Sequence, residues 1–272
     1  MKTKLDIVPL YHQVTGEGEP ILMISGLSAD HMAWLPLIDP LSRQYKVITF
    51  ENRGCGQSPS PNGTSTIEHF AHDTIALMDQ LNIDKAHIVG QSMGTTIAQY
   101  IAADFPNRVD KLILSNGMTK SDKTSEYAFR LIGHLMDDGA PRKRIMEALL
   151  PWSFSNNFLD NKDNVDLIID FYLHNPNPQT IEGFWLQYKA VYSVDTTPLL
   201  PKIKAPTLII AGDEDLLTNL KDAEVLQRGI KGSQLTVIPN MAHVPHVEDP
   251  EHFLKIVQDF LRPVTNPNCH KE

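Results

Sequence analysis

The sequence predicts an α/β fold with a mostly parallel, doubly wound sheet, and two observations carry this prediction. Short runs rich in Ile, Val and Leu end at Gly, Asn or Pro, as strands buried on both faces do, at residues 20–25, 46–50, 86–89, 111–114, 207–210 and 234–238. Between several of these runs, apolar residues recur at helical spacing, as at residues 67–78 and 253–260. Strands that alternate with helices favour a parallel sheet covered by helices.

One long interval breaks this alternation. From about residue 121 to residue 201 no strand pattern occurs, while helical patterns follow one another at residues 127–136, 144–150, 165–173 and 181–192. We therefore expect a core made of residues 1–120 and 201–265, a helical cap at residues 121–200, and a loose tail at residues 266–272.

The expected cap is rich in aromatic residues: Trp152, Phe154, Phe158, Phe171, Tyr172, Phe184, Trp185, Tyr188 and Tyr192. Most of these rings are expected to pack small helices against the sheet, and a minority to line a pocket. Trp152, Phe184 and Trp185 are the pocket candidates.

Composition excludes several classes of partner. The 33 acidic and 24 basic residues give a formal charge of −9, which disfavours a nucleic acid or an anionic membrane surface. No apolar run is long enough for a membrane span, and no signal peptide is visible. The two cysteines, Cys55 and Cys269, are far apart and indicate neither a disulfide framework nor a metal site. We expect a cytoplasmic protein without cofactor or metal, acting on a small molecule; the oligomeric state stays open.

The segment G-Q-S-M-G at residues 90–94 directly follows an expected strand and precedes a helix-like run. A serine on a sharp turn between strand and helix leaves little room for side chains two positions to either side, so Gly90 and Gly94 fit a nucleophile elbow around Ser92. The pentapeptide alone is common by chance, and its context carries the prediction.

A serine hydroxyl needs a base within hydrogen-bond reach, and the base needs a group that holds its tautomer. The expected strand at 207–210 is followed by A-G-D-E-D at residues 211–215, and the strand at 234–238 by P-N-M-A-H at residues 239–243. Both segments would emerge at the carboxyl edge of the sheet, where open α/β folds bind ligands.

These motifs resemble the α/β-hydrolase superfamily over residues 20–261, in particular its serine-nucleophile, esterase-like or enol-lactonase-like members with a helical cap between strands six and seven. Five motifs occur in the family's order: I-S-G-L at 24–27, R-G-C-G-Q-S at 53–58, the elbow at 90–94, G-D-E-D at 212–215, and I-P-N-M-A-H at 238–243 with Glu248 and Pro250. Three positions depart from the family pattern: Ser25 replaces a histidine, Glu51 an aspartate and Ala242 a glycine.

The resemblance implies that Ser92 is the nucleophile, His243 the general base and Asp215 the acid that holds His243. His246 is the alternative base, and Asp213 and Glu214 are the alternative acids, although the family's G-x-x-D spacing selects Asp215. Some members place the acid after strand six, but here the segment L-S-N-G at 114–117 holds no carboxylate.

The backbone N–H groups of Leu27 and Met93 would form the oxyanion hole on the same resemblance. The implied reaction is hydrolysis of a small or medium carboxylic ester or lactone through an acyl-serine. Hydrolysis of a carbon–carbon bond or a thioester by the same triad, or a ligand-binding signalling role on the same fold, are the alternatives.

Other reactive side chains have simpler interpretations. His69, His72 and His87 have no partners at metal-ligand spacing and are expected on helices or at the surface. Cys55 lies inside the R-G-C-G turn, where a structural role is expected rather than a reactive thiol.

Overall fold

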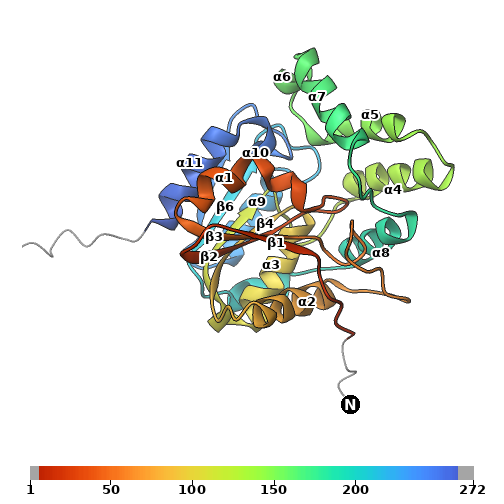
Figure 1. Ribbon diagram of the computed structural model, residues 1–272. Coiled ribbons are helices and arrows are strands. Elements are labelled where there is room, and N and C mark those ends of the chain that lie inside the picture. The colour runs from red at the N-terminus through yellow and green to blue at the C-terminus, as the bar shows by residue number, and fades with distance from the viewer. Residues whose placement is uncertain (1–5, 263–272) are drawn as a thin grey trace, which may run out of the picture.

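A computed structural model describes residues 6–262, and the described residues form one seven-stranded sheet (Figure 1). The strands are β1 His12–Thr15, β2 Glu19–Ile24, β3 Tyr45–Phe50, β4 Ala86–Gln91, β5 Val109–Ser115, β6 Thr207–Gly212 and β7 Gln234–Ile238. Their order across the sheet is β1-β3-β2-β4-β5-β6-β7, and all neighbours are parallel except the edge pair β1 and β3. The predicted α/β sheet is confirmed with all six expected strands. The short, mostly exposed β1 was missed because it has no apolar run.

The buried strands are apolar on both faces, and successive residues serve opposite faces. In β2, Leu22 and Ile24 belong to one hydrophobic cluster, while Ile21 and Met23 belong to the other. This alternation follows from the two-residue period of a strand. It explains why these strands appear in the sequence as continuous apolar runs.

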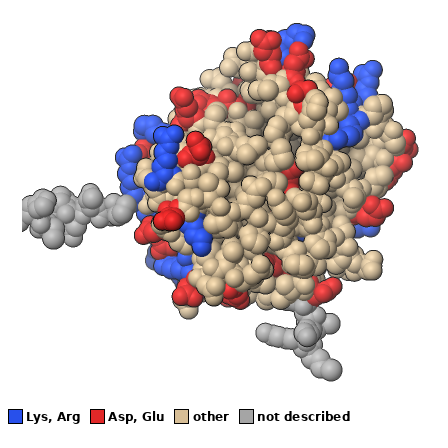
Figure 2. Space-filling view, viewed as in Figure 1, with Lys and Arg blue, Asp and Glu red and all other residues tan. Residues whose placement is uncertain are grey.

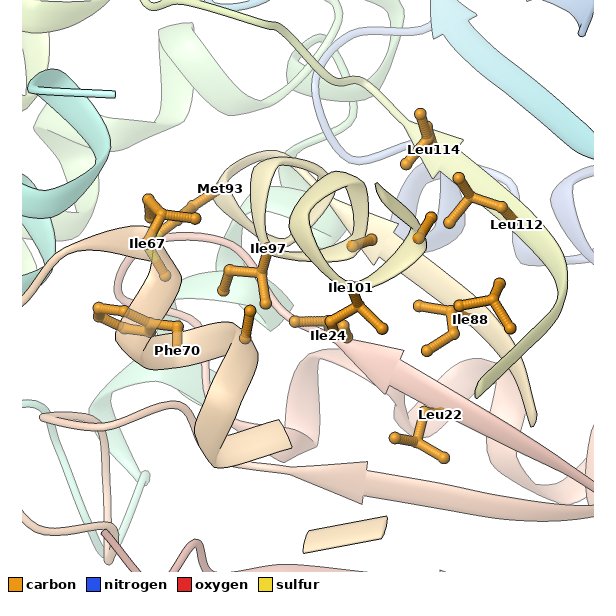
Figure 3. Packing of buried hydrophobic residues seen from close by; sticks show 14 of the residues in the cluster. Leu22, Ile24, Ile67, Phe70, Ile88, Met93, Ile97, Ile101, Leu112 and Leu114 are labelled. Carbon is orange, nitrogen blue, oxygen red and sulfur yellow. The ribbon is translucent and has the colours of Figure 1, made fainter. Parts of the chain in front are cut away.

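Helices cover both faces of the sheet (Figure 1). Helices α1 Leu35–Ser42 and α11 Pro250–Leu261 contribute to one hydrophobic cluster, and helices α2 Ile67–Gln80, α3 Met93–Asp104 and α9 Leu220–Gly229 to the other. In Figure 3, Ile97 and Ile101 of α3 point toward side chains of the central strands and of α2. The core therefore fixes the start of α3, which directly follows the expected nucleophile. The shorter helical segments are η1 His31–Trp34, η2 Pro106–Arg108, η3 Thr197–Lys202 and α10 Pro245–Glu248.

A group of helices lies between β5 and β6: α4 Lys123–Asp137, α5 Arg142–Ser153, α6 Asn156–Leu159, α7 Lys162–Leu173 and α8 Ile181–Tyr192. All four helices expected in this interval are present, and the one-turn α6 was not expected. In the family's strand numbering, on which the expected position of the cap was based, β5 and β6 are strands six and seven. The limits of the cap at residues 121 and 200 stay a prediction, and the tail at 266–272 lies outside the described residues.

The cap helices have small hydrophobic clusters of their own. Ile132, Ile145, Phe184 and Tyr188 form one, and a second one around Phe154 reaches residues beside the histidine loop of the core. The cap helices thus pack against one another and also against the core, so the cap surface that faces the core has a defined shape.

Within residues 6–262, no helix has both the length and the apolar character that a membrane crossing needs. Charged side chains of both signs lie mainly around the rim of the face shown in Figure 2, and its middle is largely uncharged.

Candidate active site

Ser92 lies between the end of β4 and the start of α3, as the elbow motif predicts. Its backbone has φ 53° and ψ −122°, a conformation that side-chain-bearing residues rarely adopt. A Cβ on Gly90 would lie 2.5 Å from the Gly94 carbonyl oxygen, and a Cβ on Gly94 would lie 2.1 Å from the Ile24 carbonyl oxygen. Both glycines are therefore needed for the close approach of strand, turn and helix.

His243 and Asp215 meet beyond the carboxyl ends of β7 and β6. The His243 Nδ1 lies 2.9 Å from the Asp215 Oδ2, and the two residues are only 5% and 4% exposed. Because Nδ1 faces the carboxylate, Nε2 is the ring nitrogen left to act as a base. The Gln91 side-chain amide donates to the His243 carbonyl oxygen at 3.0 Å, which ties the histidine loop to the residue before Ser92.

The Asp215 carboxylate accepts several hydrogen bonds besides that of His243. The backbone N–H groups of Leu217 and Thr218 donate to Oδ1, and the Asn116 amide and the Thr218 hydroxyl donate to Oδ2. Burial by itself would raise the pKa of Asp215, but the His243 charge and these hydrogen bonds outweigh it, so the pKa lies below its usual value. The carboxylate stays ionised and can stabilise a protonated His243.

Asn116 is a site residue that the sequence motifs did not reveal. Its amide nitrogen donates to Asp215 at 2.8 Å and to the Ala242 carbonyl oxygen at 2.9 Å, so it links the acid loop to the histidine loop. Its backbone has φ 48°, which Asn tolerates better than most residues. The available signal was its position after β5, where the sequence places an amide in a segment without a carboxylate.

His246, the alternative base, is placed differently. It is 2% exposed, its ring lies 4.7 Å from the Trp34 ring centroid, and it also contacts Phe253. Burial, with a smaller effect of the His243 charge, lowers its pKa to about 3. The ring is neutral, packs between aromatic residues and forms part of the wall of the cavity between the core and the cap, and His243 is the histidine that Asp215 holds.

The loop after β2 lies directly against Ser92. A Cβ on Gly26 would lie 2.6 Å from the Gln91 Oε1 and 3.0 Å from the Ser92 Cβ. Leu27 follows in this loop, and Met93 follows Ser92 as the first residue of α3. The two backbone N–H groups expected to form the oxyanion hole therefore belong to two segments that adjoin the serine.

A mainly apolar cavity of about 520 Å³ lies between the core and the cap. Its wall includes Gln91 and Val244, the chain neighbours of Ser92 and His243. Aromatic residues of the cap form part of it: Phe154, Phe158, Phe171 and Tyr172. The volume lies in the range typical of small-molecule sites.

The three cap aromatics selected as pocket candidates do not line this cavity. Phe184 is fully buried in the cap, and both it and Trp185 pack over Gly133, where a Cβ would clash with their rings. The Trp185 indole also donates to the Asp137 carboxylate. Trp152 is absent from the cavity wall as well, so other members of the aromatic set provide it.

The remaining candidates have structural roles. His69 and His72 lie on α2 as expected, but the expectation for His87 was wrong: it lies in β4 and is buried. Burial also raises the pKa of the Cys55 thiol well above its usual value, which disfavours the reactive thiolate. Among the residues that the structure describes, no three or more His, Cys, Asp or Glu are grouped so as to hold a metal ion.

Two positions that depart from the family pattern make specific contacts. The Ser25 hydroxyl accepts a hydrogen bond from the Trp34 indole and donates to the Asp30 carbonyl oxygen. The Glu51 carboxylate lies 2.8 Å from the His31 Nδ1 and is buried. Both contacts fix the loops around the cavity.

The chain is similar to known proteins over most of its length. The chain is 29% identical over 255 residues to 3-oxoadipate enol-lactonase 1 of Acinetobacter baylyi, covering 93% of this chain and 92% of the relative. The crystal structure of the enol-lactonase from Burkholderia xenovorans LB400 is 27% identical and superposes with a TM-score of 0.84, covering 93% of this chain and 96% of that one. A thermophilic esterase from Thermogutta terrifontis is 28% identical, with a TM-score of 0.82 and coverage of 94% and 93%. A family model described as the alpha/beta hydrolase fold matches residues 19–250, and the chain therefore belongs to the α/β hydrolase fold family.

Proposed function

We propose that the protein is a serine hydrolase that cleaves a small or medium, uncharged carboxylic ester or lactone through an acyl-serine intermediate. The observation that carries the proposal is the buried His243–Asp215 hydrogen bond, held by Gln91 beside the strained elbow of Ser92. In such an arrangement the base and its orienting acid serve a nucleophile that the fold exposes at the sheet edge.

The reaction follows from these positions. Ser92 Oγ attacks the carbonyl carbon while His243 Nε2 takes its proton, and the negative charge on the carbonyl oxygen is stabilised by the N–H groups of Leu27 and Met93. His243 then gives the proton to the leaving alcohol oxygen as the acyl–oxygen bond breaks. Water, deprotonated by the same nitrogen, attacks the acyl-serine; the bond between the acyl carbon and Ser92 Oγ breaks, His243 returns the proton to Ser92 Oγ, and the acid is released. Asp215 stabilises the imidazolium formed in each half of the reaction.

The cavity wall favours an uncharged substrate. Among the described residues that line it, none is Lys or Arg, while Asp30 and Glu248 contribute carboxylates. A substrate with a carboxylate near the scissile bond would be placed in an apolar space without a cationic partner, which is costly. An apolar acyl or alcohol group instead gains from contact with rings such as Phe154 and Phe158.

The test measures hydrolysis of the p-nitrophenyl esters of acetate, butyrate, octanoate and palmitate by the wild type and by Ser92→Ala. We expect the best turnover at acetate, butyrate or octanoate, and a fall of about three orders of magnitude or more for Ser92→Ala. A neutral γ-lactone and its carboxylate-bearing analogue are compared in parallel, and the neutral one should react faster. Equal, low rates for both proteins on every ester and lactone would refute the proposal and favour a carbon–carbon substrate, a thioester or a binding role.

A further inference from the structure

We propose that Gln187, a cap residue, is a positioning residue for the oxyanion hole. This inference rests on the proposed function, because it concerns the loop that carries the Leu27 N–H. Gln187 lies on α8 and is fully buried, and its side-chain amide reaches two separate loops of the core.

The two ends of the Gln187 amide have different partners. Its Oε1 accepts a hydrogen bond from the Ser28 backbone N–H at 3.0 Å, and its Nε2 donates to the Arg53 carbonyl oxygen at 3.0 Å. A donor faces the oxygen and an acceptor faces the nitrogen, so only one orientation of the amide satisfies both loops. The bond to Arg53 is buried and the bond to Ser28 is partly buried, so losing the side chain would leave a backbone C=O and a backbone N–H without their protein partners.

The Ser28 contact acts on the residue expected to stabilise the oxyanion. Ser28 has φ 68°, a left-handed conformation that needs support in a residue other than glycine. Its N–H belongs to the peptide plane that follows Leu27, which joins the plane of the Leu27 N–H at the Leu27 Cα, so a shift of Ser28 can reach that N–H through one backbone atom. Within the described residues, the Leu27 N–H donates to no acceptor, while the next two N–H groups donate to Gln187 and to the Gly26 carbonyl oxygen. Among the described residues, the Leu27 N–H is thus a donor without a protein acceptor, as an oxyanion donor needs to be.

The helix that carries Gln187 is fixed firmly to the core. A Cβ on Gly183 would lie 1.9 Å from the Gly54 carbonyl oxygen, so the start of α8 touches the R-G-C-G turn. Leu186 and Ala190, on either side of Gln187, are buried in the main hydrophobic cluster. The amide is therefore presented from a rigid element, as precise positioning requires.

Gln187 itself is not part of the wall of the cavity, so it does not contribute to the surface that would hold a substrate. Ser28 does belong to that wall, so removal of the Gln187 side chain should disturb the stabilisation of charge in the transition state strongly and the binding of the ester only slightly. This separation of kcat from KM distinguishes a positioning role from a general loss of structure.

The experiment compares Gln187→Met with Gln99→Met, using p-nitrophenyl butyrate. Gln99 is a matched control: it is fully buried on α3, more than one helical turn beyond Met93, its amide donates to the Met118 carbonyl oxygen and it accepts a bond from the Thr196 hydroxyl. Neither of these two partners lies on a segment that carries an oxyanion donor. We expect kcat of Gln187→Met to fall about tenfold to a hundredfold, below the loss of a complete oxyanion donor, with KM changed less than about threefold. Gln99→Met should keep kcat.

Hydrogen exchange of the Ser28 amide gives a readout that does not depend on turnover. Gln187→Met should accelerate its exchange, and Gln99→Met should not. Gln187→Glu keeps the acceptor that Ser28 uses and should lose less kcat than Gln187→Met. If Gln187→Met does not fold, Gln187→Leu, which also removes the acceptor, takes its place.

Unchanged exchange at Ser28 in Gln187→Met, or faster exchange without a loss of kcat, would overturn the inference. Equal losses of kcat in Gln187→Glu and Gln187→Met would overturn it too, because they would assign the effect to the Arg53 bond. A wild type without activity on any ester would count against the proposed function, whereas the exchange at Ser28 would still show whether Gln187 holds the loop.

Discussion

The replacement His246→Phe tests the electrostatic account of the site. The ring is buried against Trp34 and Phe253, which lets Phe keep most of the packing while it removes the titrating group. With a pKa of about 3 in the folded protein and 6.5 in the unfolded chain, the unfolded state binds an additional proton below about pH 6.5. The stability that comes from a neutral His246 is therefore complete at pH 8 and is lost as the pH falls toward about 3.

The size of this effect follows from the two pKa values. Linkage gives a loss of about 2 kcal/mol between pH 8 and pH 5, rising to a ceiling of about 4 to 5 kcal/mol at pH 3 and below. In the window from pH 5 to pH 8, Asp215, whose pKa lies below its usual value, stays ionised in both proteins and does not contribute to the difference.

The assay is urea-induced unfolding at pH 8 and pH 5, for the wild type and for His246→Phe, each giving a free energy of unfolding. The decrease from pH 8 to pH 5 should be about 2 kcal/mol smaller in the variant. The same decrease in both proteins would refute the argument, because it would show that His246 takes up its proton equally well in the folded state.

Two further predictions concern buried polar groups. Arg53→Met leaves the Asp73 carboxylate buried without its guanidinium partner, 2.6 Å away, and should lower the free energy of unfolding by about 3 to 5 kcal/mol. Arg228→Met, at an exposed ion pair, should lower it by less than about 1 kcal/mol, and similar urea midpoints for the two variants would contradict this prediction. Asn116→Gly allows the left-handed backbone of this position but removes a hydrogen bond to the Asp215 carboxylate. The variant should raise the pKa of Asp215 and lower kcat for p-nitrophenyl butyrate about tenfold. An unchanged kcat would show that Asp215 does not depend on this amide.

The sheet and the elbow could be predicted from the sequence because their signals are local. Apart from β1, the strands of the sheet contain short apolar runs, and Gly90 and Gly94 mark a turn whose steric demands are set within a few residues. The His243–Asp215 contact also follows from local signals, because parallel strands deliver the residues after β6 and β7 to the same edge.

The rest of the site depends on contacts between segments far apart in the chain. Asn116 carries no motif, and its value comes from where β5 ends relative to Asp215. The cavity wall was predicted less well: the ring of Phe184 turned out to pack over Gly133, while Phe171, on another cap helix, lines the cavity. Helical periodicity indicates which face of a cap helix is apolar, but it does not indicate whether that face meets another helix, the sheet or a substrate.

The central claim, that Ser92 forms a covalent bond with the substrate carbonyl, is tested most directly by labelling with an alkyl fluorophosphonate. Intact-protein mass and peptide mapping should show one phosphonyl group per chain, attached at Ser92, and no label on Ser92→Ala. A label on another residue of the wild type, or ester hydrolysis that persists in Ser92→Ala, would contradict the account.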